Sequence, residues 1–471
     1  MVSPEVDNTR RRRGGDENMS NDGDVSNDSH GGNGSRVRSE TMRKVLLGLG
    51  FWIQGFRCFP WMGVNFFLKD SLRVDPSTLQ ILQSSANLPM VAKPFYGILS
   101  DSIYISGQHR IPYIAFGAFL QALSWFVLAL LSYSAAISFS TITAYLLLGN
   151  LGASIVEVAN DAIVAELGKQ PSPSSTSSGE LQSFVWMAAS LGGILGNLLV
   201  GIVINRISAQ DMFILFGVLL SLQFLVTVFI KESTLDLPKS SSSSSSSMSN
   251  HHGIKKQLSE LMVALKNPEI SYSIAWFAAS FAAVPALTGT MFYYQTQHLK
   301  IETSVLGISK VFGQIMMLLW GVIYNKHLKS VSPRKLIAGI QVLMAVLMLS
   351  DMLFVKGVYG RIGIPESLYV VIISGFLEML CFFKILPFSV LMAQLCPPGC
   401  EGSVMVFLMS AVALAMVVSG YLGVALASHV KVTSGNDFSG FPSGLLIQAA
   451  STLVPLVCSS FIPDGPKPKT S

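Results

Sequence analysis

Long apolar stretches separated by short polar segments are the feature that most limits how this chain can fold. Half of its 471 residues are hydrophobic and only 13% are charged, whereas an ordinary globular domain is about 25% charged. Twelve windows of about 20 residues are long and apolar enough to cross a bilayer as helices. The sequence therefore predicts an all-α, multi-pass membrane protein with twelve transmembrane helices, surrounded by lipid. The windows are 45–67, 78–99, 111–131, 141–165, 183–205, 211–230, 272–294, 304–325, 335–355, 367–392, 403–427 and 443–462.

Of two long polar segments, one precedes all twelve windows and the other divides them into two sets of six. Residues 1–43 are polar and are predicted to form a disordered cytosolic tail. Residues 232–270 include eight consecutive serines and are predicted to be a cytosolic linker. We therefore expect one six-helix bundle at 44–231, a second at 271–463, and a short cytosolic tail at 464–471.

The distribution of Lys and Arg indicates the orientation in the membrane. These residues are roughly three times as frequent in the segments on the side of the two termini as in the opposite loops. We therefore expect both termini in the cytosol, in a plasma or organelle membrane. The net charge of +5 is read as a topology signal, so no nucleic-acid partner is expected. A monomer is the expected state.

The two halves of the chain resemble each other in sequence. The matches flank the second window of each half and keep nearly the same offset. Two six-helix halves related by a parallel repeat are the layout of major-facilitator transporters, which bind substrate near the midplane between the halves. The matching segments are 72–79 with 299–306, and Gly97, Asp101 and Arg110 with Gly321, Asn325 and Arg334.

A candidate gate follows the second window. Gly97, Ser100 and Asp101 form a G-x-x-S-D motif, and Arg110 ends the short loop before the third window. A glycine lets another helix approach closely, an aspartate can cap a helix N-terminus, and an arginine stays in the cytosolic interface. The arrangement resembles the turn between the second and third helices of the major facilitator superfamily. We therefore interpret Gly97, Asp101 and Arg110 as gating residues.

Ionisable residues inside apolar windows are costly in a bilayer and mark candidate functional sites. Four polar residues of the fourth window are spaced by 4, 3 and 4 positions and so share one helix face. They are Asn150, Ser154, Glu157 and Asp161. Two carboxylates on one face can share or relay a proton. Glu157 and Asp161 are therefore candidates for substrate binding and proton coupling, and a structural hydrogen-bond network between helices is the alternative.

Four other charged residues are candidates for substrate binding. Arg57 lies in the middle of the first window, and we expect it to pair with a carboxylate of the fourth window or with an anionic substrate. Lys93 lies nearer the cytosolic end, so its ammonium group can alternatively extend into the interface. Glu378 and Lys384 are six residues apart in the tenth window, which puts them on different faces and predicts different partners.

Small residues and prolines predict how the helices pack. Gly192 and Gly196 form a GxxxG pair, and small residues recur every four positions from Ala411 to Ala427. Pro285 and Pro387 are expected to kink the seventh and tenth helices, because proline removes a helical hydrogen bond.

Signals for enzymatic or metal chemistry are weak. The sequence has no P-loop, dinucleotide fingerprint or nucleophile elbow, which disfavours an ATP-driven pump or an enzyme. His251 and His252 form an isolated doublet, and Cys396 and Cys400 flank a Pro-Pro-Gly turn, so neither pair supplies a complete metal site. We expect no cofactor and no bound metal.

Several short motifs spread over residues 50–460 carry a more specific resemblance. They are Gln54-Gly55, Asn65 to Asp70, Leu88-Pro89, Lys93 to Gly97, Ser100-Asp101, Arg110 to Tyr113, Glu157 to Asp161, Leu181 to Ser183, Tyr324-Asn325, Leu328 to Val331, Leu395 to Gly399 and Ser419-Gly420. With these motifs the chain resembles the folate–biopterin transporter family, in particular its plant-type branch. The resemblance implies a multi-pass carrier of folates and pterins that is coupled to protons.

The chain departs from this family at three places. The family often has an arginine near Trp61, where this chain has Arg57 instead. An acidic residue that often precedes the glutamate of the tenth helix is missing before Glu378, and apolar residues replace an Asn-Gly pair after Ser410. These departures concern the substrate and leave the fold unchanged.

We therefore expect a secondary carrier that moves a folate- or pterin-like anion by alternating access, with protons as co-substrate. Arg57, Lys93 and Lys384 are candidates for binding the carboxylates of folate. A carboxylate such as Glu157 or Asp161 can accept two adjacent donors of a pterin edge, and its protonation would weaken that contact. The alternatives are a carrier of another solute, such as a sugar, an amino acid or nitrate, and a transport-inactive receptor or scaffold.

Overall fold

The computed structural model describes residues 28–132, 138–168, 178–204, 206–235, 259, 261–396, 401–432 and 437–463. Within these ranges the regular structure is helical, apart from one isolated bridge between Ile105 and Gln108, which confirms the all-α class. The serine run, His251, His252 and the Pro-Pro-Gly turn at 397–399 lie outside the described residues.

The helices form two sets, which we call the N bundle and the C bundle. The N bundle comprises α1 (Asp28–Phe56), α2 (Cys58–Phe66), η1 (Phe67–Ser71), α3 (Pro76–Ala86), η2 (Leu88–Ala92), α4 (Lys93–Ser102), α5 (Ile111–Leu131), α6 (Phe139–Gly168), α7 (Ser178–Val203) and α8 (Ala209–Phe229), followed by the short turn η3 (Glu232–Leu235). The C bundle comprises α10 (Pro268–Ala282), α11 (Thr288–Tyr293), η4 (Tyr294–His298), α12 (Thr303–Ile323), η5 (Tyr324–Leu328), α13 (Pro333–Val355), α14 (Val358–Arg361), α15 (Glu366–Tyr369), η6 (Val370–Ser374), α16 (Gly375–Phe383), α17 (Ile385–Leu395), α18 (Glu401–His429), α19 (Phe441–Leu453) and η7 (Val454–Phe461).

Nine helical segments among the described residues are long and apolar enough to cross a membrane, by length and composition. They correspond to nine of the twelve predicted windows. The other three windows, 45–67, 78–99 and 272–294, are divided by interruptions into helical pieces too short to span by themselves. The structure therefore supports a multi-pass membrane protein, and the number twelve depends on counting these interrupted segments as spans.

Prolines account for the interruptions, because each removes a backbone donor and displaces the carbonyl four residues earlier. Pro60 follows the break at Arg57, Pro89 lies within the 3₁₀ segment η2, and Pro94 lies just after it. Pro285 lies in the break between α10 and α11, as predicted. The predicted effect of Pro387 is also seen, because the path of the tenth window breaks at Lys384, between α16 and α17.

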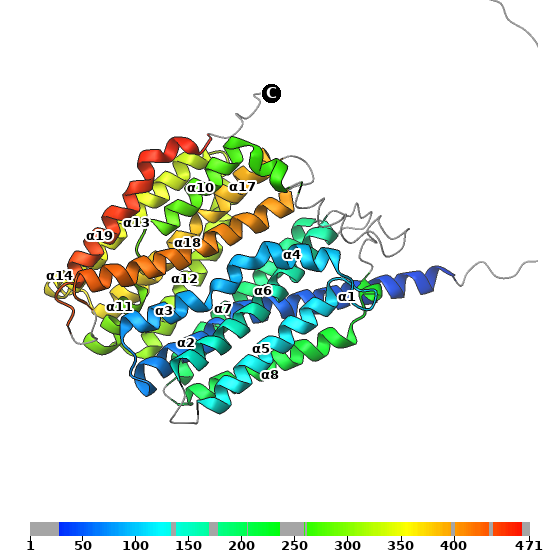
Figure 1. Cartoon of the computed structure of the whole chain (residues 1–471), viewed down its shortest axis with the longest axis horizontal. Helices are drawn as coiled ribbons and strands as arrows, with labels where there is room; N and C mark the ends of the chain where they lie inside the picture. The colour runs from blue at the N-terminus through cyan, green and yellow to red at the C-terminus, as the bar shows by residue number, and fades with distance from the viewer. Residues whose placement is uncertain are drawn as a thin grey trace, which may run out of the picture.

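The two bundles meet along two pairs of contacts. Helix α7 packs against α12, and α3 and α4 pack against α18. Figure 1 shows the N bundle, coloured from blue to green, beside the C bundle, coloured from green to red, with α18 next to α3 and α4. Elements far apart in the sequence therefore line the boundary between the bundles.

The internal repeat predicted from sequence is visible in the backbone. Arg73 and Lys300, which the repeat pairs, both adopt a positive φ, of 50° and 52°. Each follows a five-residue π-helical turn, η1 in the N bundle and η4 in the C bundle. Because a positive φ is uncommon outside glycine, its recurrence at matched positions supports the parallel repeat.

Glycines set the closest helix approaches. A Cβ atom at Gly192 would lie 2.1 Å from the carbonyl oxygen of Trp52, and one at Gly423 would lie 1.6 Å from that of Ala286. Both predicted small-residue faces are thus in close contact with a neighbour. Gly97 differs, because a Cβ there would lie 3.5 Å from the Val158 side chain, an ordinary contact. The expectation that Gly97 permits an unusually close approach is therefore wrong.

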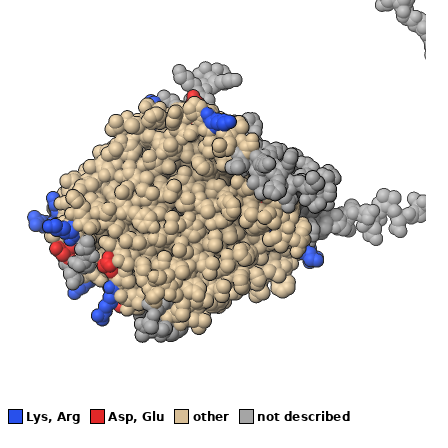
Figure 2. Space-filling view, viewed as in Figure 1, with Lys and Arg blue, Asp and Glu red and all other residues tan. Residues whose placement is uncertain are grey.

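The surface in Figure 2 carries almost no Lys, Arg, Asp or Glu across its middle, and charged residues gather towards its margins. This is the charge distribution expected of a surface that faces lipid. The structure departs from the segment boundaries predicted from hydropathy, because helix and buried residues extend into the predicted tail and linker. Helix α1 begins at Asp28, and Leu235, Leu261 and Ala264 are buried in the cores. The buried pieces around Leu235, Leu261 and Ala264 are too short for a hydropathy window to detect.

Candidate functional site

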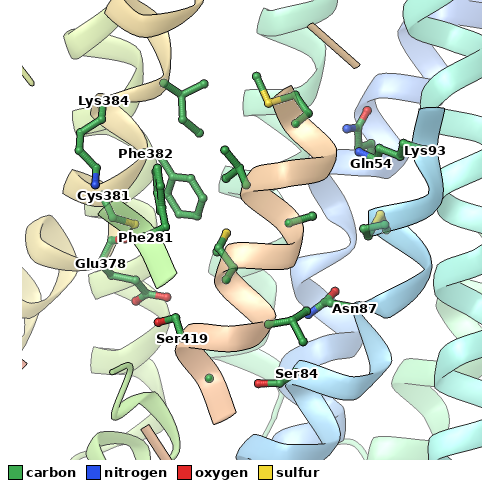
Figure 3. Close-up of a pocket in the computed structure, with 18 of the residues that line it drawn as sticks. Gln54, Ser84, Asn87, Lys93, Phe281, Glu378, Cys381, Phe382, Lys384 and Ser419 are labelled. Atoms are coloured by element: carbon green, nitrogen blue, oxygen red, sulfur yellow. Dashed lines mark hydrogen bonds between the residues drawn. The ribbon is translucent and has the colours of Figure 1, made fainter. Parts of the chain in front are cut away.

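A cavity of about 1670 Å³ lies between the two bundles. Figure 3 shows Gln54, Asn87 and Lys93 of the N bundle on one side, and Phe281, Glu378 and Lys384 of the C bundle on the other. Its wall combines charged groups, amides, methionines and aromatic rings. The polar and charged residues that line it include Gln54, Asn65, Gln83, Asn87, Lys93, Asp161, Lys310, Asp351, Glu378, Lys384, Ser419 and Gln448.

The bundles are joined at one end of this cavity by the side chain of Gln80 in α3. Its amide nitrogen donates to the carbonyl oxygens of Ala286 at 2.6 Å and Gly420 at 2.7 Å. Its amide oxygen accepts from the Gly289 backbone N–H at 2.9 Å. The break around Pro285 leaves the Ala286 carbonyl and the Gly289 N–H without helical partners, and one glutamine satisfies both.

Away from Gln80, the cavity reaches the other end of the helices. Its wall includes Asp101, His109 and Arg110 of the N bundle, and Gly402 and Ser403 at the start of α18. These residues lie at the turns that the distribution of basic residues assigns to the cytosol. The bundles are therefore linked by Gln80 towards one end of the cavity, and the cavity extends towards the opposite end.

Arg57, Lys93 and Glu157 form an ion-pair cluster inside the N bundle. Arg57 Nη1 lies 2.7 Å from one carboxylate oxygen of Glu157, and Lys93 Nζ lies 2.7 Å from the other. The break between α1 and α2 places Arg57, the start of α4 places Lys93, and α6 carries Glu157. The expected pairing of Arg57 with a carboxylate of the fourth window is confirmed. Lys93 turns inwards to the same carboxylate, so its alternative placement in the interface is wrong.

Asp161 lies one helical turn beyond Glu157 and borders the cavity together with Lys93, whereas Arg57 and Glu157 do not border it. Within the described part of the chain, the Asp161 carboxylate makes no hydrogen bond or ion pair. Asn150, on the same predicted stripe, donates to the carbonyl oxygen of Ala86 at 2.6 Å. The stripe is thus divided between a structural contact at Asn150 and a cavity-facing carboxylate at Asp161.

A second ion pair joins two helices of the C bundle at the cavity wall. Lys310 of α12 contacts both carboxylate oxygens of Glu378 in α16. The two side chains are 29% and 41% exposed, more than those of Arg57, Lys93 and Glu157. Lys310 is missing from the residues predicted by sequence, although its position inside an apolar window is a signal that could have found it.

Lys384 has partners different from those of Glu378, as predicted. Its ammonium group donates to Gln341 Oε1 at 3.0 Å and to Ser280 Oγ at 3.2 Å, and lies 3.9 Å from the centre of the Phe281 ring. The side chain borders the cavity, but none of it is exposed. Among the described residues, no carboxylate pairs with it.

Asp351 in α13 is another buried acid that the sequence analysis missed. It borders the cavity and accepts a hydrogen bond of 3.0 Å from the hydroxyl of Tyr369. That hydroxyl also lies 2.9 Å from Ser350 Oγ. An aspartate within the ninth apolar window was the available signal.

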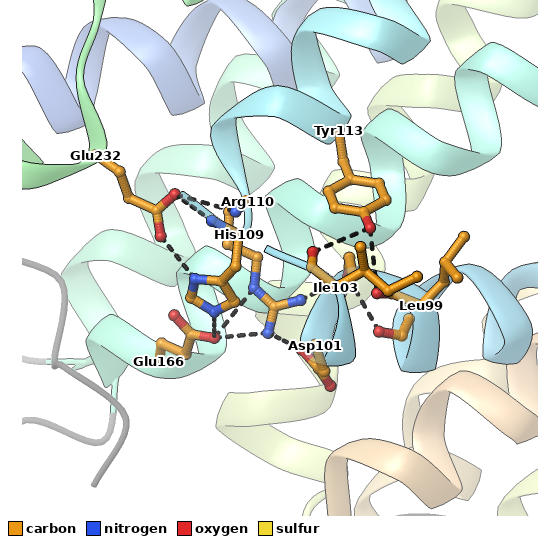
Figure 4. Close-up of polar contacts among 10 residues, drawn as sticks. Leu99, Asp101, Ile103, His109, Arg110, Tyr113, Glu166 and Glu232 are labelled. Carbon is orange, nitrogen blue, oxygen red and sulfur yellow. Dashed lines mark hydrogen bonds and ion pairs between the residues drawn. The ribbon is translucent and has the colours of Figure 1, made fainter. Parts of the chain in front are cut away.

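The predicted gate is part of a wider network at the end of the N bundle. Arg110 pairs with Asp101 and, at 2.6 Å, with Glu166. His109 Nδ1 lies 2.7 Å from Glu232, whose other oxygen accepts from the His109 backbone N–H at 2.8 Å. Figure 4 shows His109 and Arg110 directed towards these acids. The pairing of Asp101 with Arg110 agrees with a gate, whereas His109, Glu166 and Glu232 come from three segments that no single motif connects.

The environment of His109 favours its charged form. Burial would lower the pKa of His109, but hydrogen bonds to Glu166 and Glu232 outweigh it and raise the pKa to about 9. Burial would raise the pKa of Glu232, but the hydrogen bond from His109 holds it below its ordinary value. The network therefore holds two cations and three carboxylates at neutral pH.

The carboxylates of Asp101 and Glu166 and the ring of His109 offer ligand atoms within 4.8 Å of one another, a spacing that can suit a metal ion. Arg110 contacts both of these carboxylates. Its guanidinium occupies their oxygens and would repel a metal cation, so the arrangement is that of a salt-bridge network.

Comparison with known proteins adds independent information. The sequence model of the BT1 family matches residues 54–469. The Arabidopsis thaliana protein named "Probable folate-biopterin transporter 7" is 61% identical over 94% of this chain and 98% of its own length. "Probable folate-biopterin transporter 8, chloroplastic", from the same plant, is 44% identical over 89% and 75%. The crystal structure of a D-xylose-proton symporter aligns with a TM-score of 0.65 at 15% identity, over 90% of this chain and 98% of that one, which shows a fold of the major-facilitator type.

Proposed function

Because this chain belongs to the BT1 family, we propose that it is a secondary transporter that moves folate- or pterin-like compounds across a membrane by alternating access. The observation that carries this proposal is the charged cavity between the two bundles, which Gln80 links towards one end and which extends to the Asp101–Arg110 pair at the other. A carrier needs a central site that can reach either side in turn, and two bundles that meet around such a cavity supply it.

The wall of the cavity suits a flat, partly anionic molecule. Phe281, Phe382 and several methionines offer apolar surface that adapts to a ring system. Lys93 and Lys310 border the same space and can attract carboxylates. The names of the similar plant proteins support folates and pterins as the substrate class.

We include protons as co-substrate. Both oxygens of Glu157 contact cations, so this residue is better suited to holding Arg57 and Lys93 in place. Asp161 keeps its oxygens available on the cavity wall, which makes it the better proton carrier of the two predicted residues. Arg57, Lys93, Glu157 and Asp161 together sum to zero charge when all are ionised, so a proton on Asp161 would leave one positive charge to favour an anion.

We further propose that both termini face the cytosol and that the chain acts as a monomer. The roughly threefold excess of Lys and Arg on that side supports the orientation. The cavity in this structure would then extend towards the cytosol. One similar protein carries the word chloroplastic in its name, so an organelle membrane is a candidate besides the plasma membrane.

The direct test is uptake of radiolabelled folic acid and of an uncharged pterin by cells that lack their own carrier, at pH 5.5 and 7.5. We expect saturable uptake that is faster in acid and is abolished in Asp101→Asn, which breaks the gate pair. Absence of uptake of both compounds, in protein shown to fold and to reach the surface, would overturn the proposal.

Two other functions make different predictions. A carrier of another solute would bind a sugar, an amino acid or nitrate in a titration of purified protein, and not folic acid. A transport-inactive receptor or scaffold would bind no solute. The Asp101–Arg110 pair argues for transport, because a scaffold does not need a gate.

A further inference from the structure

The basic residues inside the membrane differ in how available they are to a ligand. Arg57 and Lys93 share Glu157 and are 19% and 20% exposed, and Lys384 is fully buried. Lys310 is 29% exposed, borders the cavity, and has a partner, Glu378, that is itself 41% exposed. Among the described basic residues within the membrane windows, Lys310 is therefore the most accessible from the cavity.

We propose that Lys310 and Glu378 form a proton-controlled receptor for an anionic group of the substrate. This inference rests on the proposed function. A proton from water in the cavity binds one oxygen of Glu378, which neutralises the carboxylate and releases the ammonium group of Lys310. The substrate carboxylate then takes the place of Glu378 beside Lys310. Release of the substrate and loss of the proton restore the original pair.

The charge balance of this exchange explains why the proton and the anion would move together. The empty receptor holds one cation and one carboxylate, so its net charge is zero. The loaded receptor holds the same cation, a neutral acid and the substrate anion, and its net charge is again zero. An anion without the proton, or a proton without the anion, leaves one unbalanced charge on the cavity wall within the membrane span, which is unfavourable.

Other titratable groups lie on α16 and on the elements packed against it, but they do not take the place of Lys310 as the partner of Glu378. Of the elements packed against α16, α12 contributes Lys310, and α13 contributes Asp351, whose carboxylate is hydrogen-bonded to Tyr369. Arg334 and Lys335 lie in the first turn of α13, towards the opposite end of that helix from Asp351. Lys384, at the junction with α17, bonds Gln341 and Ser280, and Cys381 lies on α16 itself.

The position of the pair fits a receptor. Glu378 is 12 residues from the start of α15, which corresponds to about 18 Å of helix rise and places it near the middle of the span. Phe281, Phe382 and Ser309 border the same part of the cavity wall in the C bundle. They can hold the uncharged body of a ligand while Lys310 holds its carboxylate.

The test compares uphill uptake with exchange for variants of both residues in reconstituted vesicles with an inward proton gradient. In Glu378→Gln the side chain cannot release a proton, so we expect uphill accumulation of folic acid to fall at least about tenfold, while folate–folate exchange is kept. The conservative variant Glu378→Asp should retain acid-stimulated accumulation. In Lys310→Met we expect the KM for folic acid to rise about ten- to a hundredfold, with uptake of an uncharged pterin much less affected.

Lys44→Met is the matched control, because it also removes the lysine of an ion pair, but at an exposed site outside the cavity. Equal loss of folate and pterin uptake in Lys310→Met, in protein that keeps the size-exclusion profile of the wild type, would assign the pair a structural role and overturn the inference. Acid-stimulated accumulation that persists in Glu378→Gln would also overturn it, while leaving the proposed function intact. A wild-type protein that moves neither compound would instead overturn the proposed function, and the inference with it.

Discussion

The side-chain amide of Gln80 in α3 donates a hydrogen bond of 2.7 Å to the backbone carbonyl oxygen of Gly420 in α18, and thereby connects the two bundles. The packing around it is tight, because a Cβ at Gly420 would lie 2.0 Å from Ser84 Oγ. Alternating access requires that this end of the cavity open. In the transport cycle that we propose, the bonds of Gln80 would therefore break each time this end opens.

Replacing Gln80 with alanine should loosen this end of the cavity. Each hydrogen bond contributes about 1 kcal/mol, so losing those of Gln80 should raise the population open at this end about fivefold or more. The measurement is the rate at which a membrane-impermeant thiol reagent, added on the non-cytosolic side, labels a cysteine at the exposed cavity residue Thr288. Gln83→Ala is the control, because Gln83 bonds Asn65 within the N bundle. Equal labelling of both variants would contradict a sealing role for Gln80.

Gly55→Ala should destabilise the N bundle. A Cβ at this position would lie 1.8 Å from the carbonyl oxygen of Ala189 in α7, so α1 and α7 would have to separate. We expect a loss of about 1–3 kcal/mol in the free energy of unfolding, measured by thermal unfolding in detergent. Gly321→Ala is the control, because no atom lies within 4 Å of its added Cβ. A Gly55 variant as stable as the Gly321 variant would show that the helices shift at little cost.

Glu157→Gln should be among the most destabilising changes of a charged residue, because it leaves both Arg57 and Lys93 without their carboxylate. Loss of one partner of a buried ion pair costs about 3–5 kcal/mol. The double variant Arg57→Met, Glu157→Gln should lose less stability than the sum of the two single variants. A double-mutant cycle with thermal unfolding measures this coupling, and additive losses would argue against a direct interaction.

The stability that His109 provides should depend on pH. Because hydrogen bonds raise the pKa of His109 from 6.5 to about 9, its contribution is complete below about pH 6.5 and is lost as the pH rises through 9. The difference in melting temperature between wild type and His109→Gln should therefore shrink between pH 7 and pH 10. His429→Gln, at an exposed position at the end of α18, serves as the control. A difference that stays constant across this range would exclude a charged His109 as its source.

Local patterns predicted several features correctly. The apolar windows predicted the helical class, and Pro285 and Pro387 marked real interruptions. The spacing on the fourth window placed Glu157 on an inward face, and a cation in the middle of the first window had to find a counter-charge, so the pairing of Arg57 was predictable. Each of these inferences depends on one segment and on its interaction with the bilayer.

Other parts of the site were not predictable from the sequence alone. Lys310 and Glu378 are 68 residues apart, and His109 meets Glu166 and Glu232 from separate segments. Gly97 looked like a packing glycine, but its neighbour Val158 stays at an ordinary distance. No sequence motif specifies the distances between these residues, because those distances are determined by how whole helices pack.

The amino-acid sequence was sufficient for the membrane class, the repeat and the identity of most charged residues in the cavity. It was sufficient because the cost of placing polar groups in lipid acts on each segment separately. The tertiary structure decided that Glu157 binds two cations, that the Lys310–Glu378 pair faces the cavity, and that Gln80 links the two bundles. These relationships depend on contacts between segments up to 340 residues apart, and such contacts exist only once the two bundles have packed together.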